Sequence, residues 1–253
     1  MNLGCGKRPA TGISWVFQHV EEAIILEDDC VPDPSFFRFC EELLARYRRD
    51  ERVMMISGDN FLPGLACKPY SYYFCRSTGL WGWATWRRAW RYFDMGIESW
   101  SSLRDSSWLL DIQGNPGSAS YWRKIFDRIQ DAGDAVDIWD YQWTFAVWSQ
   151  KGYGISPRVN LVQNIGFGKD ATHTNSAPSR NTSIPSSEIS FPLRHPPHVA
   201  VDPDVDRLIF ERVYAPRRDP KPSALRRRAC GKLSSLAPAA IRKAIRHVRS
   251  KWT

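Results

Sequence analysis

Four apolar residues, Ala23–Leu26, lead directly into three consecutive carboxylates, Glu27, Asp28 and Asp29. A short continuous apolar run bounded by turn-forming residues is typical of a strand buried on both faces, as in a parallel sheet covered by helices. Open sheets of this kind place their ligand sites at the carboxyl ends of strands. The pattern therefore predicts a buried strand that delivers three acidic side chains to one edge of a sheet.

Adjacent carboxylates repel one another and lose hydration when buried, so a cation or hydrogen-bond donors must compensate their charge. Oxygen ligands suit Mg²⁺ or Mn²⁺, which commonly join a protein carboxylate to a substrate diphosphate. A second interpretation is that the triplet caps the next helix, because Pro34 and Ser35 follow closely and acidic residues favour helix starts. The triplet alone leaves both interpretations open.

The order of the segments around this strand favours an α/β fold. Apolar residues recur at helical spacing over 11–20 and 35–50, and a second short apolar run, Val53–Ile56, follows the latter. Strand, helix and strand in this order form a parallel crossover unit. Further strands are expected at 70–76, 154–157 and 160–165, and further helices at 121–130 and 139–151. The segment 79–90 begins with a Gly- and Trp-rich stretch and is expected to continue as a helix with Arg87, Arg88 and Arg91 exposed.

The length of 253 residues allows one main domain plus a tail. We expect the domain to cover residues 1–176, a Pro- and Ser-rich wrap or linker with one short helix to cover 177–222, and a basic tail to cover 223–253. No apolar stretch reaches the roughly 20 residues needed to span a bilayer, and the first residues lack the apolar core of a secretory signal. A cytoplasmic protein with reduced cysteines is the expectation.

The net charge of +8 is concentrated at one end of the chain. Residues 217–253 hold twelve Lys and Arg and one Asp, a net charge of +11, which leaves −3 on residues 1–216. Apolar and basic residues alternate at helical spacing over 238–252, which suggests binding to an anionic membrane surface at the inner face of the membrane. Nucleic acid and a solvated tail are the alternatives, and because the domain has no nucleic-acid motif, no nucleic-acid partner is expected.

Five motifs in a fixed order resemble the GT-A class of nucleotide-diphospho-sugar glycosyltransferases, in particular the N-acetylglucosaminyltransferase I-type enzymes and their bacterial relatives. The resemblance covers roughly residues 2–175. Residues 27–37 are similar to the family's Glu-Asp-Asp strand end with a Pro-Asp-Phe-Phe-like helix start, and 57–60 to its Ser-x-x-Asn segment. Residues 79–83 are similar to its Gly/Trp-rich loop, 139–143 to its Trp-Asp-x-x-Trp helix start, and 157–173 to its Phe-Gly…His ending. The implied fold is a GT-A-like (Rossmann-like) mixed, mostly parallel sheet with helices on both faces.

The resemblance implies a metal-dependent transfer of a hexosyl or N-acetylhexosaminyl group from a nucleotide-diphosphate donor to a hydroxyl of a carbohydrate or lipid-linked acceptor. Asp29 would bind Mn²⁺ or Mg²⁺, which offsets the charge of the departing diphosphate, and Glu27 and Asp28 would position the metal's water shell and the ribose. Asp140 would be the catalytic base that deprotonates the acceptor, with inversion at the anomeric carbon. The alternative role of Asp140 is to cap the helix that it begins.

Other residues of the motifs have weaker assignments. His173 is a candidate second metal ligand or phosphate contact, or a loop residue with no role. Trp81, Trp83 and Trp86 are candidates to stack on sugar faces, with at least one of them packing under the sheet. Asp59 and Asn60 are candidates to hydrogen-bond the donor sugar, and a plain turn is the alternative.

Compared with the family pattern, the first strand-helix-strand unit, which forms the pocket for the nucleotide base, is absent before the acidic triplet. We therefore expect an N-terminally truncated domain, and one interpretation is that this fragment is inactive. One rival interpretation is a non-catalytic remnant of the fold that binds membrane or a partner through its basic tail. Another is a metal-dependent phosphohydrolase, which is disfavoured because no further Asp/His pair stands at a suitable spacing.

Overall fold

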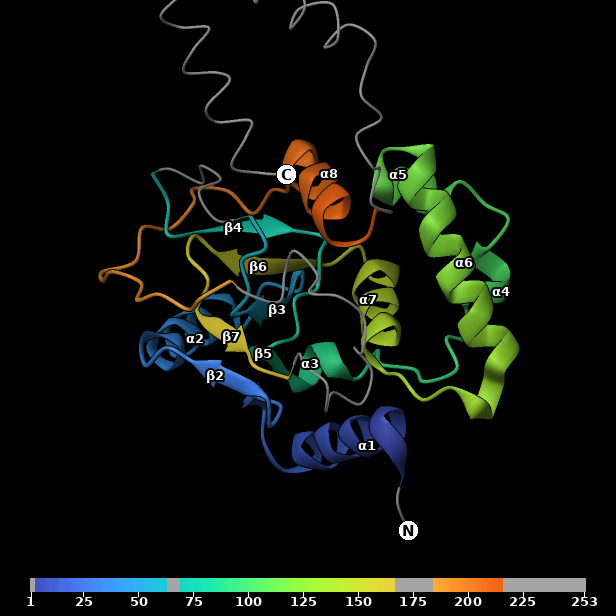
Figure 1. Ribbon diagram of the computed structural model, residues 1–253, viewed down its shortest axis with the longest axis horizontal. Coiled ribbons are helices and arrows are strands. Elements are labelled where there is room, and N and C mark those ends of the chain that lie inside the picture. Colours follow the sequence, from blue (N-terminus) through green and yellow to red (C-terminus); the bar gives the residue numbers. More distant parts are fainter. Residues whose placement is uncertain (1–2, 63–68, 167–183, 216–253) are drawn as a thin grey trace, which may run out of the picture. The chain divides into compact units, whose positions relative to one another are not determined.

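The computed structural model describes residues 3–62, 69–166 and 184–215. All of them belong to the first of two units into which the chain divides, Met1–Ala215 and Pro216–Thr253. The expected basic tail lies outside the described residues. The elements are α1 (Gly4–His19), β1 (Glu22–Ile25), β2 (Cys30–Pro32), α2 (Ser35–Tyr47), β3 (Val53–Ser57), β4 (Tyr72–Cys75), β5 (Trp83–Trp86), α3 (Arg87–Trp90), α4 (Trp100–Leu103), α5 (Trp108–Gln113), α6 (Pro116–Ala132), the 3₁₀ helix η1 (Gly133–Ala135), α7 (Asp140–Ser149), β6 (Tyr153–Pro157), β7 (Val162–Asn164) and α8 (Pro203–Val213) (Figure 1).

The main sheet has five strands in the order β1-β5-β3-β6-β4. The pairing of β3 with β6 is parallel, and the other three pairings of this sheet are antiparallel. The expectation of a mixed α/β sheet is therefore confirmed, but the description of that sheet as mostly parallel is wrong. Strands β1, β3 and β6 nevertheless run in one direction, so their carboxyl ends meet at the same edge.

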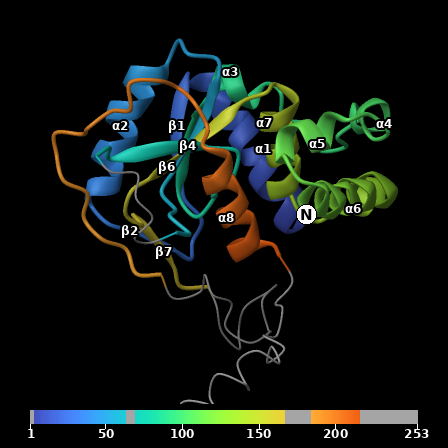
Figure 2. The same cartoon turned by 90° about the horizontal axis from the view of Figure 1, so that it is seen from above.

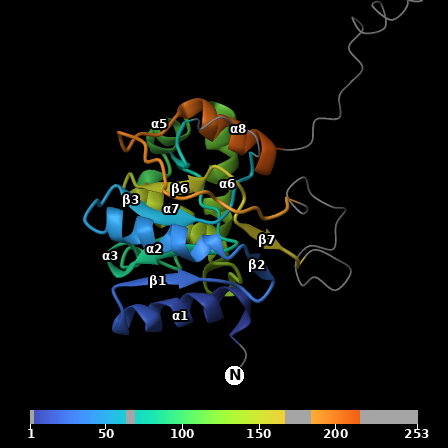
Figure 3. The same ribbon diagram turned by 90° about the vertical axis from the view of Figure 1, so that its left-hand side faces the viewer.

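Helices cover both faces of the sheet, as expected, because β1, β3 and β5 each contribute residues to two apolar clusters. One cluster combines α1, α3, α6 and α7 with Trp83 and Met55, and the other combines α2 with Ala84, Trp86 and Ile56. Figure 3 shows α1 and α2 on opposite sides of β1. The positions that alternate along β5 therefore bury both of its faces.

Strand β5 was not expected from the sequence, where 79–90 was interpreted as a glycine-rich start of a helix. The helical part is limited to the four residues of α3. Arg91 is exposed as expected, but Arg87 and Arg88 are half-buried. Arg88 donates to the backbone carbonyls of Tyr47, Arg48 and Val53. Arg88 is therefore a structural cross-link between α2, β3 and α3.

The crossover unit β1–α2–β3 forms as predicted, with β5 inserted between its two parallel strands. α1 begins earlier than the predicted helix over 11–20, and α2 ends at Tyr47 rather than at residue 50. The segment expected as an edge strand at 160–165 instead forms β7, which pairs with β2 in a separate two-stranded sheet. This small sheet lies directly after the acidic triplet in the chain.

Residues 184–215, which fall within the expected wrap or linker, pack on the domain. Ile189 and Leu193 join the cluster around α2, and Phe210 and Tyr214 of the α8 region pack on the cluster around α7. Figure 2 shows this segment running in orange past α2 to α8. Among the described residues, no helix combines the length and apolar character that crossing a bilayer requires.

Candidate active site

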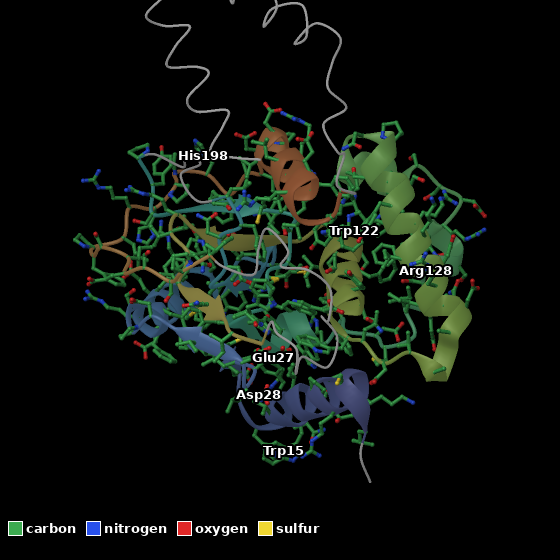
Figure 4. All side chains as sticks on the ribbon, in the orientation of Figure 1. Trp15, Glu27, Asp28, Trp122, Arg128 and His198 are labelled. Atoms are coloured by element: carbon green, nitrogen blue, oxygen red, sulfur yellow. The ribbon has the colours of Figure 1, made fainter. Side chains whose placement is uncertain are left out.

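The acidic triplet forms a tight turn at the carboxyl end of β1. The N–H of Cys30 donates to the carbonyl of Glu27 at 3.1 Å, which leaves Asp28 and Asp29 at the two central positions of the turn. The N–H of Ile165, directly after β7, donates to the carbonyl of Asp29 at 2.8 Å. The turn is thus held between the main sheet and the β2–β7 pair, and Figure 4 shows Glu27 and Asp28 projecting from it.

The carboxylate of Glu27 lies in a field of like charges. Surrounding atoms first, and then the charges of Asp29, Asp140 and Asp28, raise the pKa of Glu27 to about 7, although Glu27 is exposed to solvent, which weakens these effects. Asp140 begins a helix far along the chain, so its contribution means that α7 starts within electrostatic range of the acidic turn. The two acidic motifs singled out in the sequence therefore act on the same carboxylate.

Asp140 is the first residue of α7, whereas the N-cap is Trp139, which makes no side-chain capping bond. The start of α7 is supported by tryptophan packing, since Trp83 stacks on Trp139 with ring centroids 5.9 Å apart and lies 5.6 Å from Trp143. Because large buried aromatic side chains pack in few geometries, this cluster fixes the position of the first turn of α7, which carries Asp140.

Three tyrosines near Asp140 were not identified from the sequence. Burial raises the pKa of Tyr141, Tyr214 and Tyr121, and the charge of Asp140 adds to this shift in each case. Tyr121 comes from α6 and Tyr214 follows α8, and their rings lie 5.8 Å apart. Tyr141 lies within the motif at 139–143 and Tyr121 begins the helix expected at 121–130, but neither pattern marks a tyrosine as part of a site, and nothing in the sequence marks Tyr214.

Asp59 and Trp81 are joined beneath the same edge of the sheet. The N–H of Trp81 donates to Oδ2 of Asp59 at 3.0 Å, and the other carboxylate oxygen has no hydrogen-bond partner among the described residues. Burial raises the pKa of Asp59 well above its ordinary value. Gly79 makes this approach possible, because a Cβ there would lie 2.7 Å from Oδ2 of Asp59.

The same loop also approaches the acidic turn. Gly82 has a φ of +84°, and a Cβ there would lie 3.0 Å from Cδ2 of Leu26, the residue before the triplet. Asp59 itself is only 1% exposed. It therefore lies below the surface of the site, and Trp81, which is half-buried, is the aromatic side chain of this loop that remains accessible.

Two residues expected to bind the sugar, Trp83 and Asn60, are buried and contact other parts of the fold instead, which corrects their assignment. Trp83 is fully buried within the tryptophan cluster, so its faces are covered. Asn60 is 1% exposed, and its side chain donates to the carbonyl of Arg158 at 2.7 Å and accepts from the N–H of Leu62 at 2.8 Å. Asn60 thereby ties the loop after β3 to the loop after β6. Trp86, also considered for stacking, is buried in the α2 cluster.

The donor set of the acidic turn suits a hard divalent cation, although no group of three or more His, Cys, Asp or Glu side chains converges on a common point in the described ranges. Mg²⁺ and Mn²⁺ are often held by one or two carboxylates, with substrate phosphates supplying the remaining ligands. The repulsion among these carboxylates, which adds to the effect of burial in raising the pKa of Glu27, would be relieved by such an ion. Asp29 and its neighbours therefore fit a metal that arrives with a diphosphate, and His173 lies outside the described residues.

No family model matches the chain, and no curated protein matches its sequence significantly. The site must therefore be judged on its own chemistry. It combines a cluster of carboxylates at a strand end, a carboxylate at a helix start beside it, and an accessible tryptophan in the adjoining loop. The residue types in this combination suit cation binding and proton transfer.

Proposed function

We propose that this protein is a metal-dependent glycosyltransferase that moves a sugar from a nucleotide-diphosphate donor to a hydroxyl of a carbohydrate or lipid-linked acceptor, with inversion. The observation that carries this proposal is the electrostatic interaction between Glu27 at the end of β1 and Asp140 at the start of α7. Metal-assisted sugar transfer requires both a diphosphate-binding edge and a base on the opposite side of the sugar. These two carboxylate groups supply the residue types needed for each part.

In this reaction, Asp29 would hold the divalent cation, with His173 as a candidate second ligand, and Glu27 and Asp28 would position the metal's water shell and the donor ribose. The cation would offset the negative charge that develops on the departing diphosphate. Asp140 accepts the proton of the attacking hydroxyl. Trp81 offers a flat apolar face for a sugar ring.

The first experiment measures donor-site binding by calorimetry. Mn²⁺ and a nucleoside diphosphate are titrated into the wild-type protein, the Asp29→Ala variant and the Asp131→Asn variant, in which an exposed carboxylate of α6 is neutralised. We expect Mn²⁺-dependent nucleotide binding in the wild type and in Asp131→Asn, and its loss in Asp29→Ala. Absence of metal-dependent nucleotide binding in the wild type would refute the proposed activity for this chain.

A second experiment separates binding from catalysis at Asp140. Asp140→Asn keeps the size of the side chain but removes its basicity, so we expect donor binding to persist while transfer falls by about a hundredfold or more. A panel of nucleotide sugars, each assayed for transfer to a mixed glycan acceptor, provides the readout. Equal transfer rates in the two proteins would exclude Asp140 as the base.

A further inference from the structure

A cleft of about 270 Å³ lies at the end of α7 opposite Asp140. Its walls come from α5, from the C-terminal end of α7, from the start of β6 and from the residue after β4 (Figure 1). The lining residues are Arg76, Trp108, Asp111, Ile112, Trp148, Lys151, Gly152 and Tyr153. Small-molecule sites commonly have volumes of about 300–1,000 Å³, largely aromatic walls and a few fixed polar groups, so this cleft approaches their lower limit.

The most unusual residue of the cleft is Lys151. The N–H of Gly152 donates to the carbonyl of Val147 at 2.8 Å, and the N–H of Lys151 donates to the carbonyl of Trp148 at 2.9 Å. These two bonds define a Schellman motif, whose left-handed position is usually glycine. Lys151 occupies that position with a φ of +54°, which costs free energy relative to glycine.

No contact of the Lys151 side chain within the described residues offsets this free-energy cost. The side chain is exposed, and its ammonium makes no hydrogen bond or ion pair with the residues that the structure describes. Unfavourable backbone conformations of non-glycine residues concentrate at functional sites. A lysine at this position is therefore better explained by a ligand in the cleft than by the stability of α7.

Hydrogen bonds hold the part of the wall that Trp148 and Arg76 form. The indole N–H of Trp148 donates to the carbonyl of Arg76 at 2.7 Å, and the N–H of Arg76 donates to Oδ1 of the buried Asp206 at 2.8 Å. Trp108 is half-buried, with its ring packed 5.5 Å from Phe145. The aromatic walls are thus held in place before any ligand arrives, which lowers the entropic cost of binding.

We propose that this cleft binds one unit of a neutral saccharide. A sugar ring has an apolar C–H face, which fits the rings of Trp108 and Tyr153, and a rim of hydroxyls that both donate and accept hydrogen bonds. The carboxylate of Asp111 accepts, and the ammonium of Lys151 donates. Asp111 offsets the charge of Lys151, and Asp206 pairs with Arg76 at 3.6 Å, so the charges around the cleft balance and suit a neutral ligand.

The cleft is separate from the acidic turn. Asp140 and Lys151 stand at opposite ends of α7, about 15 Å apart at the helical rise of about 1.5 Å per residue. The proposal therefore goes beyond the proposed glycosyl transfer and does not require it. In a glycan-modifying protein, a site at this position would hold a sugar unit distant from the one that reacts.

The test is calorimetry with the methyl glycosides of glucose, galactose, mannose and N-acetylglucosamine, titrated singly into the full chain in the presence of EDTA. We expect at least one glycoside to bind in the millimolar range. Lys151→Gly should weaken its binding by about tenfold, since one hydrogen bond from a charged donor is lost, while thermal stability stays unchanged or rises because glycine suits the left-handed position. Asp111→Asn should also weaken binding.

Two controls make the result specific. Lys124→Ala removes an exposed lysine of α6 and should leave binding unchanged, and Asp29→Ala should bind the glycoside as the wild type does. Loss of binding in Asp29→Ala would place the sugar at the acidic turn and overturn the proposal. Absence of binding by all four glycosides, or equal binding to wild type and Lys151→Gly, would overturn it as well.

Discussion

The carboxylate of Asp137 accepts a hydrogen bond from the backbone N–H of Gly6 at 2.8 Å, which joins the first turn of α1 to the segment that leads into α7. The N-cap of α1, Leu3, makes no side-chain capping bond. Asp137 therefore caps this helix from a distant part of the chain, and its negative charge also suits the helix N-terminus. Through this contact, α1 helps to position the residues just before Asp140.

The first prediction concerns two glycines of α1. A Cβ on Gly6 would lie 2.6 Å from the backbone N of Ile138, whereas a Cβ on Gly12 would meet no atom within 4 Å. Gly6→Ala should therefore lower the free energy of unfolding by about 1–3 kcal/mol through steric overlap. Gly12→Ala should raise it by about 0.5–1 kcal/mol, because alanine favours an exposed helical position.

Urea denaturation of the two variants provides the comparison. Effects of the same sign would contradict the docking of the start of α1 against Ile138.

The second prediction concerns the hydroxyl of Tyr72. It lies 2.6 Å from the hydroxyl of Tyr47 and 2.9 Å from Nδ1 of His195, which also pairs with Glu42 at 3.3 Å. Tyr72→Phe should reduce the free energy of unfolding by about 1–3 kcal/mol, since it leaves buried polar groups without their partner. The exposed Tyr92 provides the matched control, and Tyr92→Phe should change it by no more than about 0.5 kcal/mol. Similar losses in both variants would argue against a buried chain of hydrogen bonds at Tyr72.

Local patterns predicted the first crossover unit well. The apolar runs of β1 and β3 and the helical spacing of α2 are each complete within a few residues, so no distant information is needed. Strand β5 was missed because the glycines before Trp83 and the arginines after Trp86 favour a helix start, and its pairing with both β1 and β3 is a long-range property. That insertion is also why the sheet has fewer parallel pairings than expected.

In the candidate site too, some residues could be predicted from local sequence and others depend on distant parts of the chain. The position of Glu27, Asp28 and Asp29 at a strand end followed from the local pattern. The neighbourhood of Glu27 and Asp140 could be anticipated only through the family resemblance, because no sequence periodicity links these residues. Tyr214 near Asp140 had no signal at all, since a buried tyrosine after a short amphipathic helix is indistinguishable in sequence from an exposed one.

The third prediction concerns Gly166 under the proposed function. A Cβ at this position would overlap Oδ2 of Asp29, so Gly166→Ala should displace that carboxylate without removing it. Mn²⁺-dependent binding of a nucleoside diphosphate should weaken by roughly tenfold, which corresponds to about 1.4 kcal/mol. Gly117→Ala, in the exposed first turn of α6, should bind as the wild type does. Wild-type affinity in Gly166→Ala would mean that the position of Asp29 does not matter for binding.

The last prediction is a pH dependence of stability that originates at Asp206. Burial raises the pKa of Asp206 to about 6, against the opposing effects of the Arg76 N–H and the Arg76 charge. Because the folded state binds this proton more tightly than the unfolded state does, the contribution of Asp206 to stability is fully present below about pH 4 and is lost as the pH rises to about 6. The loss should be on the order of 3 kcal/mol.

Asp206→Asn keeps an acceptor for the Arg76 N–H but cannot ionise, so the variant should gain stability relative to the wild type as the pH rises. The free energy of unfolding of both proteins, measured by urea denaturation at pH 4.5 and 7.5, provides the test. Asp204 is exposed on the same helix, with 81% of its side chain accessible, and Asp204→Asn should keep the wild-type difference between the two pH values. If Asp206→Asn kept that difference too, the proton that stabilises the folded state at low pH would have to be bound elsewhere in the protein.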